Sequence, residues 1–167
     1  PRYHVQHVSS GGSVELIRQV RADLFARAAV TAEVSPHHLL LTDESCATYD
    51  TRFKVNPPIR SRRDVQALLE GVADSTITIL ATDHAPHTAE EKELEFAAAP
   101  FGAIGLDCAL PLYAKALIES ETIDWPRMLA MRAQRSVWGW FWRWSCWRSP
   151  CGVGSRSWRL GSAWRFW

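Results

Sequence analysis

The sequence is poor in cysteine and contains no long apolar run. Its 167 residues include four cysteines, and no two of them form a Cys-x-x-Cys pair. A disulfide framework is therefore not expected, and the cysteines fit reduced thiols. No stretch of about 18 apolar residues occurs, which argues against a membrane-spanning helix. With no signal peptide at the amino end either, we predict a cytoplasmic protein.

The chain is also short for the architecture that its pattern indicates. A complete (β/α)8 barrel takes roughly 250 residues, whereas this chain has 167 and begins with Pro1 rather than Met. One hydrophobic core fits within this length. We therefore expect the start of the protein to be missing and, if the fold is a barrel, only a piece of it to be present.

Negative charge is absent from the carboxyl end. Residues 132–167 contain seven arginines but no lysine, aspartate or glutamate. The net charge of +1 hides this asymmetry, because all 18 acids but only 12 of the 19 basic residues lie in residues 1–131. That part carries a charge of about −6, which argues against nucleic acid as its natural partner.

The same carboxyl segment holds eight of the nine tryptophans. Ordinary domains do not have this composition. Three interpretations fit: a basic aromatic membrane-surface segment, a stacking platform for single-stranded nucleic acid, or an out-of-frame translation of a GC-rich gene. The third is favoured, because periodic patterns stop near Met131, where acids and lysines also disappear. We predict that residues 132–167 form an irregular, disordered tail after a domain of residues 1–131.

Strand and helix patterns alternate along residues 1–131. Apolar residues at a period of two predict strands, and apolar residues at spacings of three and four behind a capping residue predict helices. The predicted strands are Tyr3–Ser9, Val30–Val34 and Thr76–Ala81, and the predicted helices are Val14–Ala29, one capped by Ser61, one from Leu106 to Leu117 and one from Asp124. This order predicts an α/β fold with parallel strands joined by helices.

An aspartate and two histidines follow the third predicted strand. The segment Ala81–His87 reads Ala-Thr-Asp-His-Ala-Pro-His, so Asp83, His84 and His87 stand where a strand ends. α/β barrels keep their chemistry at that end. A carboxylate there can hold a metal or take a proton, and neutral imidazoles can bind metal or substrate.

Other histidines have simpler expected roles. Strand parity predicts that His4 faces away from His7, so we do not expect His4 to be a metal ligand. His37 and His38 are adjacent at a strand end, where consecutive side chains point apart, and we expect them to be structural. We expect His84 to turn away from the metal that its neighbour Asp83 could hold.

Five segments together resemble one enzyme family. In chain order they are Tyr3–Ser9, Thr31–Leu39, the Asn-Pro-Pro-Ile-Arg of residues 56–60, Ala81–His87, and Ala99–Gly102 followed by Gly105-Leu106. In this order and spacing they resemble the carboxyl half of a bacterial-type dihydroorotase, in the amidohydrolase superfamily. The resemblance runs from about Tyr3 to Leu129. The Asn-Pro-Pro and Thr-Asp-His-Ala-Pro-His runs favour this family over hydantoinases and allantoinases.

The resemblance implies a partial TIM barrel, with about the last three strands and their helices in this chain. It implies zinc-dependent, reversible cyclisation of N-carbamoyl-L-aspartate to dihydroorotate in pyrimidine biosynthesis. The implied partner is that small-molecule substrate, with no nucleic acid and no membrane, and homo-oligomers are an option for the complete enzyme.

The resemblance also implies roles for single residues. Asp83 would be the catalytic acid/base and a zinc ligand, and His7 would be a second zinc ligand. The remaining site residues would hold the substrate or line the pocket beside its ring: Asn56, His87, Phe101 and Gly102.

The family pattern is incomplete in this chain. A complete member has a His-x-His pair, a bridging carboxylate or carboxylated lysine, a further histidine and a substrate-binding arginine before the segment that matches Tyr3–Ser9. Two zinc ligands do not make a catalytic site with three protein ligands, so we expect the chain alone to be inactive. Three strands without their neighbours also leave two sheet edges exposed. The alternatives are a non-catalytic remnant or interaction module, and another cyclic amidase of the hydantoinase or allantoinase kind.

Overall fold

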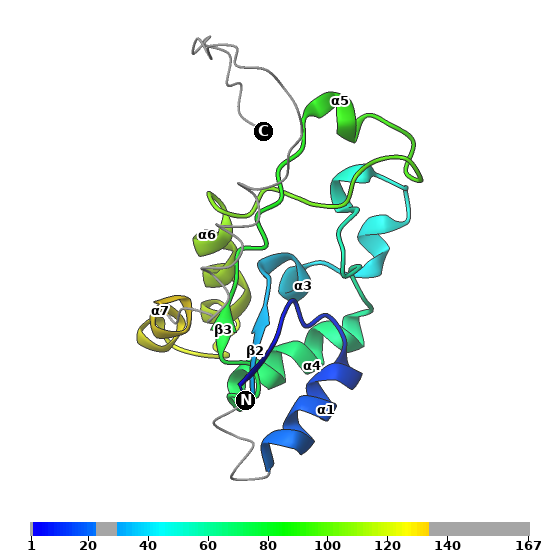
Figure 1. Ribbon diagram of the computed structural model, residues 1–167. Coiled ribbons are helices and arrows are strands. Elements are labelled where there is room, and N and C mark those ends of the chain that lie inside the picture. The colour runs from blue at the N-terminus through cyan, green and yellow to red at the C-terminus, as the bar shows by residue number, and fades with distance from the viewer. Residues whose placement is uncertain (1, 23–29, 134–167) are drawn as a thin grey trace. The chain divides into compact units, whose positions relative to one another are not determined.

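The fold consists of short strands and the helices between them. A computed structural model of the chain describes residues 2–22 and 30–133 (Figure 1). The end of the first predicted helix and the tail beyond Ala133 lie outside these residues. The elements are β1 (Tyr3–Val5), α1 (Gly11–Ala22), β2 (Val30–Val34), α3 (Pro36–Leu40), η1 (Asp43–Cys46), η2 (Thr51–Phe53), α4 (Arg62–Ala73), β3 (Ile79–Leu80), α5 (Ala89–Lys92), α6 (Ala109–Tyr113), η3 (Ala114–Ile118) and α7 (Trp125–Ala133).

The three strands form one parallel sheet in the order β1-β2-β3. Tyr3 pairs with Val30 between β1 and β2, and Glu33 pairs with Ile79 between β2 and β3. Parallel pairing brings the carboxyl ends of all three strands to the same edge. The predicted α/β fold with parallel strands is confirmed.

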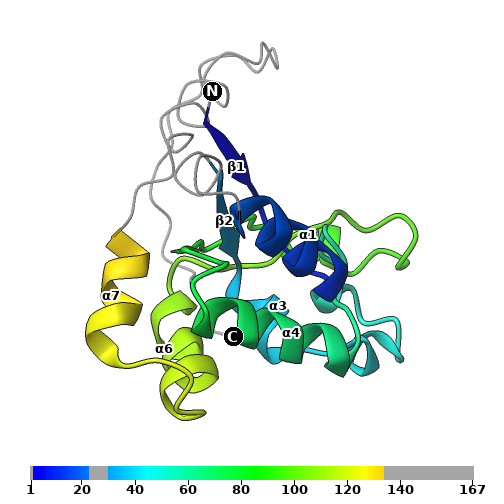
Figure 2. The same ribbon diagram turned by 90° about the horizontal axis from the view of Figure 1, so that it is seen from below.

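Helices α1 and α4 lie side by side, and α1 also contacts β2 (Figures 1 and 2). The predicted cap of α4 is confirmed, because the Ser61 side chain accepts a hydrogen bond from the Asp64 backbone N–H. The Asp64 carboxylate in turn accepts from the Gly11 N–H at 2.9 Å. One capping segment therefore ties together the starts of both helices.

Tyr113 joins the last helices to the sheet. Its side chain is fully buried, and its hydroxyl lies 2.6 Å from the carbonyl oxygens of Val34 and Ala81. These carbonyls belong to the ends of β2 and β3, so α6 is fixed against the edge where both strands finish. The Arg132 guanidinium of α7 lies 5.7 Å from the centre of the Tyr113 ring.

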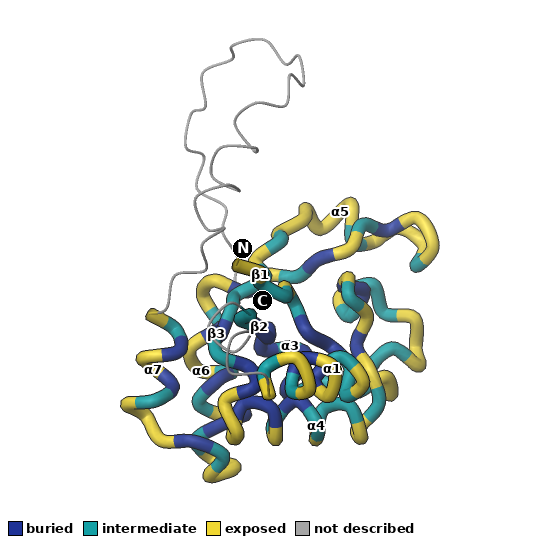
Figure 3. The backbone as a smooth tube through the Cα atoms, turned by 60° about the horizontal axis from the view of Figure 1, so that its bottom comes forward, coloured by how far each residue is buried: buried dark blue, intermediate teal, exposed yellow. Residues whose placement is uncertain are grey.

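Buried residues gather along β2 and β3 and on the inner sides of the longer helices, whereas β1 and α5 have none (Figure 3). The core includes Val14, Val34, Leu68, Val72, Ile77, Tyr113, Leu117 and Met128. None of the helices in residues 2–22 and 30–133 has the length and apolar character needed to cross a membrane.

Some sequence-based boundaries were wrong for local reasons. β1 ends at Val5 rather than Ser9, because His7 adopts a left-handed backbone with φ of 48° that a strand does not accept. β3 is only two residues long. Ser35-Pro36 does end β2, but it also starts helix α3, since proline is well suited to a first helical turn.

Candidate active site

Asp83, His7 and His37 meet at the carboxyl edge of the sheet. Each follows a different strand, and the three strands bring them together. His7 Nε2 lies 3.6 Å from Asp83 Oδ1, and His37 Nε2 lies 3.3 Å from Asp83 Oδ2. Each oxygen of the carboxylate therefore faces its own imidazole. The expected proximity of His7 and Asp83 is present, whereas the contact of His37 was not predicted.

The backbone is strained at two of these residues. His7 has a φ of 48° and Asp83 a φ of 49°, in the left-handed region that side chains disfavour. Strain of this kind costs about 1–3 kcal/mol per residue and gathers where function requires a special side-chain direction. Both residues stand just after a strand, at the edge where the imidazoles and the carboxylate meet.

The Asp83 carboxylate is held in its ionised form. Burial favours the neutral acid, but the hydrogen bond from His37 and the nearby imidazoles of His7 and His37 outweigh it, so the pKa of Asp83 lies below its usual value. The side chain keeps 19% of its surface exposed. Asp83 is thus a charged, partly accessible group that can accept a proton.

Glu33 on β2 links two histidines behind this site. Its Oε2 is 2.9 Å from His4 Nε2, and its Oε1 is 3.1 Å from His7 Nδ1. The second contact is close but does not have the geometry of a hydrogen bond, so the buried His7 Nδ1 has no hydrogen-bond partner among the residues that the structure describes. The prediction that His4 faces away from His7 was wrong, because β1 stops before His7 and strand parity does not reach it.

His37 and His38 also depart from expectation. They lie on helix α3 and not on a strand, their ring centroids are 4.4 Å apart, and both rings approach the Ser35 hydroxyl. Because a carbonyl oxygen only accepts, His38 Nε2 donates to the Pro57 carbonyl at 2.9 Å, and in the neutral ring Nδ1 then accepts from the Ser35 hydroxyl. A series of contacts therefore connects Asp83 to Pro57, the residue after Asn56. It passes through His37, Ser35 and His38.

Three of the predicted substrate-binding residues lie together. His87 Nε2 is 2.8 Å from the Phe101 carbonyl oxygen. Gly102 has a φ of 136°, and a Cβ atom there would meet the Ala85 carbonyl oxygen at 2.6 Å and His87 Nε2 at 3.1 Å. Only glycine fits this position. Asn56, the fourth residue, is exposed.

His84 turns to the backbone. Its Nδ1 accepts hydrogen bonds from the N–H groups of Gly105 and Leu106, both at 3.1 Å. These bonds hold residues 105 and 106 beside the segment that carries Asp83. His84 therefore has a structural task next to the site.

The spacing of His7 and Asp83 suits a metal ion. Two ligands of a tetrahedral zinc at about 2.0–2.1 Å lie roughly 3.4 Å apart, and His7 Nε2 and Asp83 Oδ1 are separated by 3.6 Å. Among the described residues, no group of three or more candidate side chains could hold a metal ion. The described residues thus supply a compatible pair of donors and not a full ligand set.

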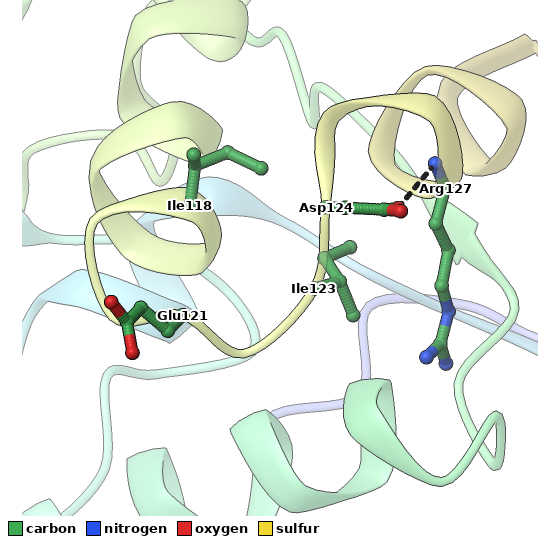
Figure 4. A pocket seen from close by; sticks show the side chains of 5 residues that line it. All are labelled: Ile118, Glu121, Ile123, Asp124 and Arg127. Atoms are coloured by element: carbon green, nitrogen blue, oxygen red, sulfur yellow. Dashed lines mark hydrogen bonds between the residues drawn. The ribbon is translucent and has the colours of Figure 1, made fainter.

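A hollow elsewhere is lined by Ile118, Glu121, Ile123, Asp124 and Arg127 (Figure 4). Arg127 donates to the carbonyls of Val72 and Ala73 at the end of α4, before β3 begins. The hollow is therefore at the amino end of the strands, opposite Asp83. No residue predicted for the site lines it.

Similar sequences carry the name dihydroorotase. The chain is 55% identical over 122 residues to the dihydroorotase of Pelotomaculum thermopropionicum, a match of 73% of this chain and 28% of the relative. It is 49% identical over 124 residues to that of Streptomyces coelicolor, covering 74% of this chain and 28% of the relative. The chain thus spans little more than a quarter of these relatives. No family model matches it.

Solved structures of cyclic amidases share the fold. An L-hydantoinase from Arthrobacter aurescens has a TM-score of 0.70 at 29% identity, over 80% of this chain and 30% of that one. A dihydroorotase from Saccharomyces cerevisiae, in complex with 5-fluoroorotic acid, has a TM-score of 0.68 at 19% identity, over 78% and 35%. At this lower identity the likeness concerns the fold.

Proposed function

Because the matching 73% of this chain belongs to the dihydroorotase family, we propose that it is part of a dihydroorotase barrel. Its reaction is the reversible cyclisation of N-carbamoyl-L-aspartate to dihydroorotate in pyrimidine biosynthesis, in the cytoplasm. The observation that carries the proposal is the ionised Asp83 between two imidazoles where three parallel strands end.

Asp83 has the properties of the acid/base. In the hydrolytic direction water adds to the ring carbonyl carbon, the ring C–N bond breaks, and one proton moves from the water to the leaving nitrogen. The lowered pKa of Asp83 keeps it ionised near neutral pH, so it can accept that proton and return it to nitrogen. His37, 3.3 Å from Oδ2, restrains the carboxylate and leaves Oδ1 on the side of His7.

His7 and Asp83 would hold a zinc ion, whose remaining ligands come from other parts of a longer protein. Bound there, zinc would polarise the ring carbonyl and lower the pKa of a bound water. The buried Nδ1 of His7 faces Glu33, which favours Nε2 as the atom directed at the metal.

The second part of the site binds the substrate ring and its carboxylate. His87, Phe101 and Gly102 form one side, and Asn56 is proposed as a further polar contact. The close packing of Gly102 on Ala85 and His87 supports a pocket wall made by backbone atoms. Small, anionic ring compounds fit this arrangement better than a macromolecule.

A completed protein tests the function. In it, residues 2–133 replace the matching segment of the Pelotomaculum dihydroorotase, and dihydroorotate hydrolysis is measured with Zn²⁺. We expect turnover by the completed protein and none by the 167-residue chain alone. Preference for hydantoin or allantoin would favour another cyclic amidase, and no turnover of any of them would favour a non-catalytic remnant.

The tail calls for a separate test. We propose that residues 132–167 are read out of frame, because their composition excludes acids and lysines. The two other reading frames of the coding DNA from the Met131 codon onward give the answer. Dihydroorotase-like sequence in either frame supports this origin, and its absence from both contradicts it.

A further inference from the structure

Lys54 is a buried lysine beside the predicted substrate-binding residues. It is 8% exposed, and its Nζ donates to the carbonyl oxygens of Phe96, Ala97 and Ala99 at 2.5, 3.0 and 2.6 Å. In residues 2–22 and 30–133 no carboxylate forms an ion pair with it. Three backbone carbonyls therefore take the place of a counter-ion.

Burying an ammonium group in this setting is energetically unfavourable. A buried charge without a counter-ion is destabilising, and an apolar side chain would fill the same space at less cost. A lysine does what an apolar residue cannot do: it binds several carbonyls at once in a fixed direction. Residues 96–102, which we call the substrate loop, are therefore fixed in orientation as well as packed.

The rest of Lys54 acts on the same loop. Its own carbonyl accepts the Gly102 N–H at 3.0 Å, and its Nζ lies 4.7 Å from the centre of the Phe101 ring. Lys54 thus holds the loop before Phe101 with its side chain and after Phe101 with its backbone. Asn56 follows two residues later in the same segment.

Lys92 is a second lysine that binds the substrate loop. Its Nζ donates to the carbonyls of Thr51 and Pro100, both at 3.0 Å. Burial and the nearby ammonium of Lys54 lower its pKa, as expected for two cations brought together. The ammonium groups of Lys54 and Lys92 therefore both bind carbonyls of the substrate loop, close to where an anionic substrate is proposed to bind.

We propose that Lys54 is a positioning residue for substrate binding, fixing Phe101 and Gly102 against the ring of a small anionic cyclic amide. The proposal rests on the proposed function. In this proposal Lys54 increases the affinity for the substrate, whereas Asp83 carries out the proton transfer. Substitution of Lys54 should therefore act on KM more than on kcat.

The test uses Lys54→Ala in the completed protein. We expect KM for dihydroorotate and Kd for orotate, an unreactive analogue, to rise about tenfold or more, with kcat changing less than about threefold. Propylammonium, the fragment that the substitution removes, should lower both constants again. Lys115→Met, which removes an exposed lysine from η3, is the control and should leave both constants unchanged.

A fall in kcat at unchanged KM and Kd would overturn the proposal, and so would unchanged kinetics. Lys54→Met keeps the length of the side chain and serves where Lys54→Ala does not fold. Amide hydrogen exchange at Gly102 gives a readout without turnover: protection should be lost in both Lys54 variants and kept in Lys115→Met. If the unsubstituted protein is inactive but Gly102 loses protection as expected, the proposed function fails while the role of Lys54 in the loop stands.

Discussion

The two ends of the sheet use charged side chains differently. At the amino end, arginines bind the backbone: Arg127 donates to the carbonyls of Val72 and Ala73, and Arg21 donates to those of Ser75 and Thr76. At the carboxyl end, the carboxylate of Asp83 faces imidazoles. Charged side chains that bind backbone carbonyls hold segments of the chain in place, and Lys54 does so beside the carboxyl-end site as well. The Asp83 carboxylate and its imidazoles, in contrast, remain able to exchange protons or bind a ligand.

The largest effect on stability is expected from His38 at the carboxyl end. Burial, and to a lesser degree the neighbouring His37, lowers the pKa of His38 from 6.5 to about 4. Between these values the unfolded chain takes up a proton that the folded chain does not, so stability falls as pH drops from about 6.5 to about 4. The free energy of unfolding should fall by about 3 kcal/mol in total. Urea unfolding of the chain across this pH range measures it.

His38→Asn is the control for this pH dependence. It removes the titrating group, so the pH dependence between about 4 and 6.5 should flatten, although the variant is less stable throughout. Asp83, whose pKa is also lowered, loses its contribution only at more acidic pH. An equal slope in the variant and the parent would show that another group titrates.

Gly102→Ala should have the next largest effect. The Cβ of an alanine at this position would lie 2.6 Å from the Ala85 carbonyl oxygen, and the alanine would have to adopt the φ of 136°. We therefore expect the free energy of unfolding to fall by about 2 kcal/mol or more. Gly12→Ala in α1 meets nothing within 4 Å and should stabilise the chain by up to about 0.5 kcal/mol. Thermal unfolding of both variants compares them, and equal effects would contradict the close packing at Gly102.

Arg127→Met tests the amino end and should have the smallest effect. It removes hydrogen bonds to two carbonyls at the end of α4 and to the Ser75 hydroxyl. Because the guanidinium is partly exposed, we expect a loss of about 1 kcal/mol in the free energy of unfolding, with KM and kcat of the completed protein unchanged. A change in KM would mean that the two ends are coupled.

Periodicity and capping rules predicted much of the fold. β2 has the predicted bounds Val30–Val34, and Ser61 caps α4 as predicted, because both features are local. Helix α3 could also have been found, since proline directly after serine marks a helix start as well as a strand end. The early end of β1 depends on the backbone of His7, for which the sequence has no local signal.

The site was only partly predictable. The motif around Asp83 drew attention to the correct strand end, and the roles of Asp83, His7, Asn56 and His87 stay predictions. His37, Glu33 and Lys54 were missed because their partners are far away in the sequence. A buried lysine whose ammonium binds carbonyls more than 40 residues away leaves no pattern in its own segment.

One measurement addresses the central claim, that the chemistry belongs to the carboxyl end. Asp83→Asn and Asp124→Asn make the same change in charge at opposite ends of the sheet, and an asparagine at position 124 can still accept the Arg127 N–H. In the completed protein, Asp83→Asn should lower kcat for dihydroorotate by roughly 10²–10⁴-fold, while Asp124→Asn leaves it unchanged. Full activity in Asp83→Asn would contradict the account.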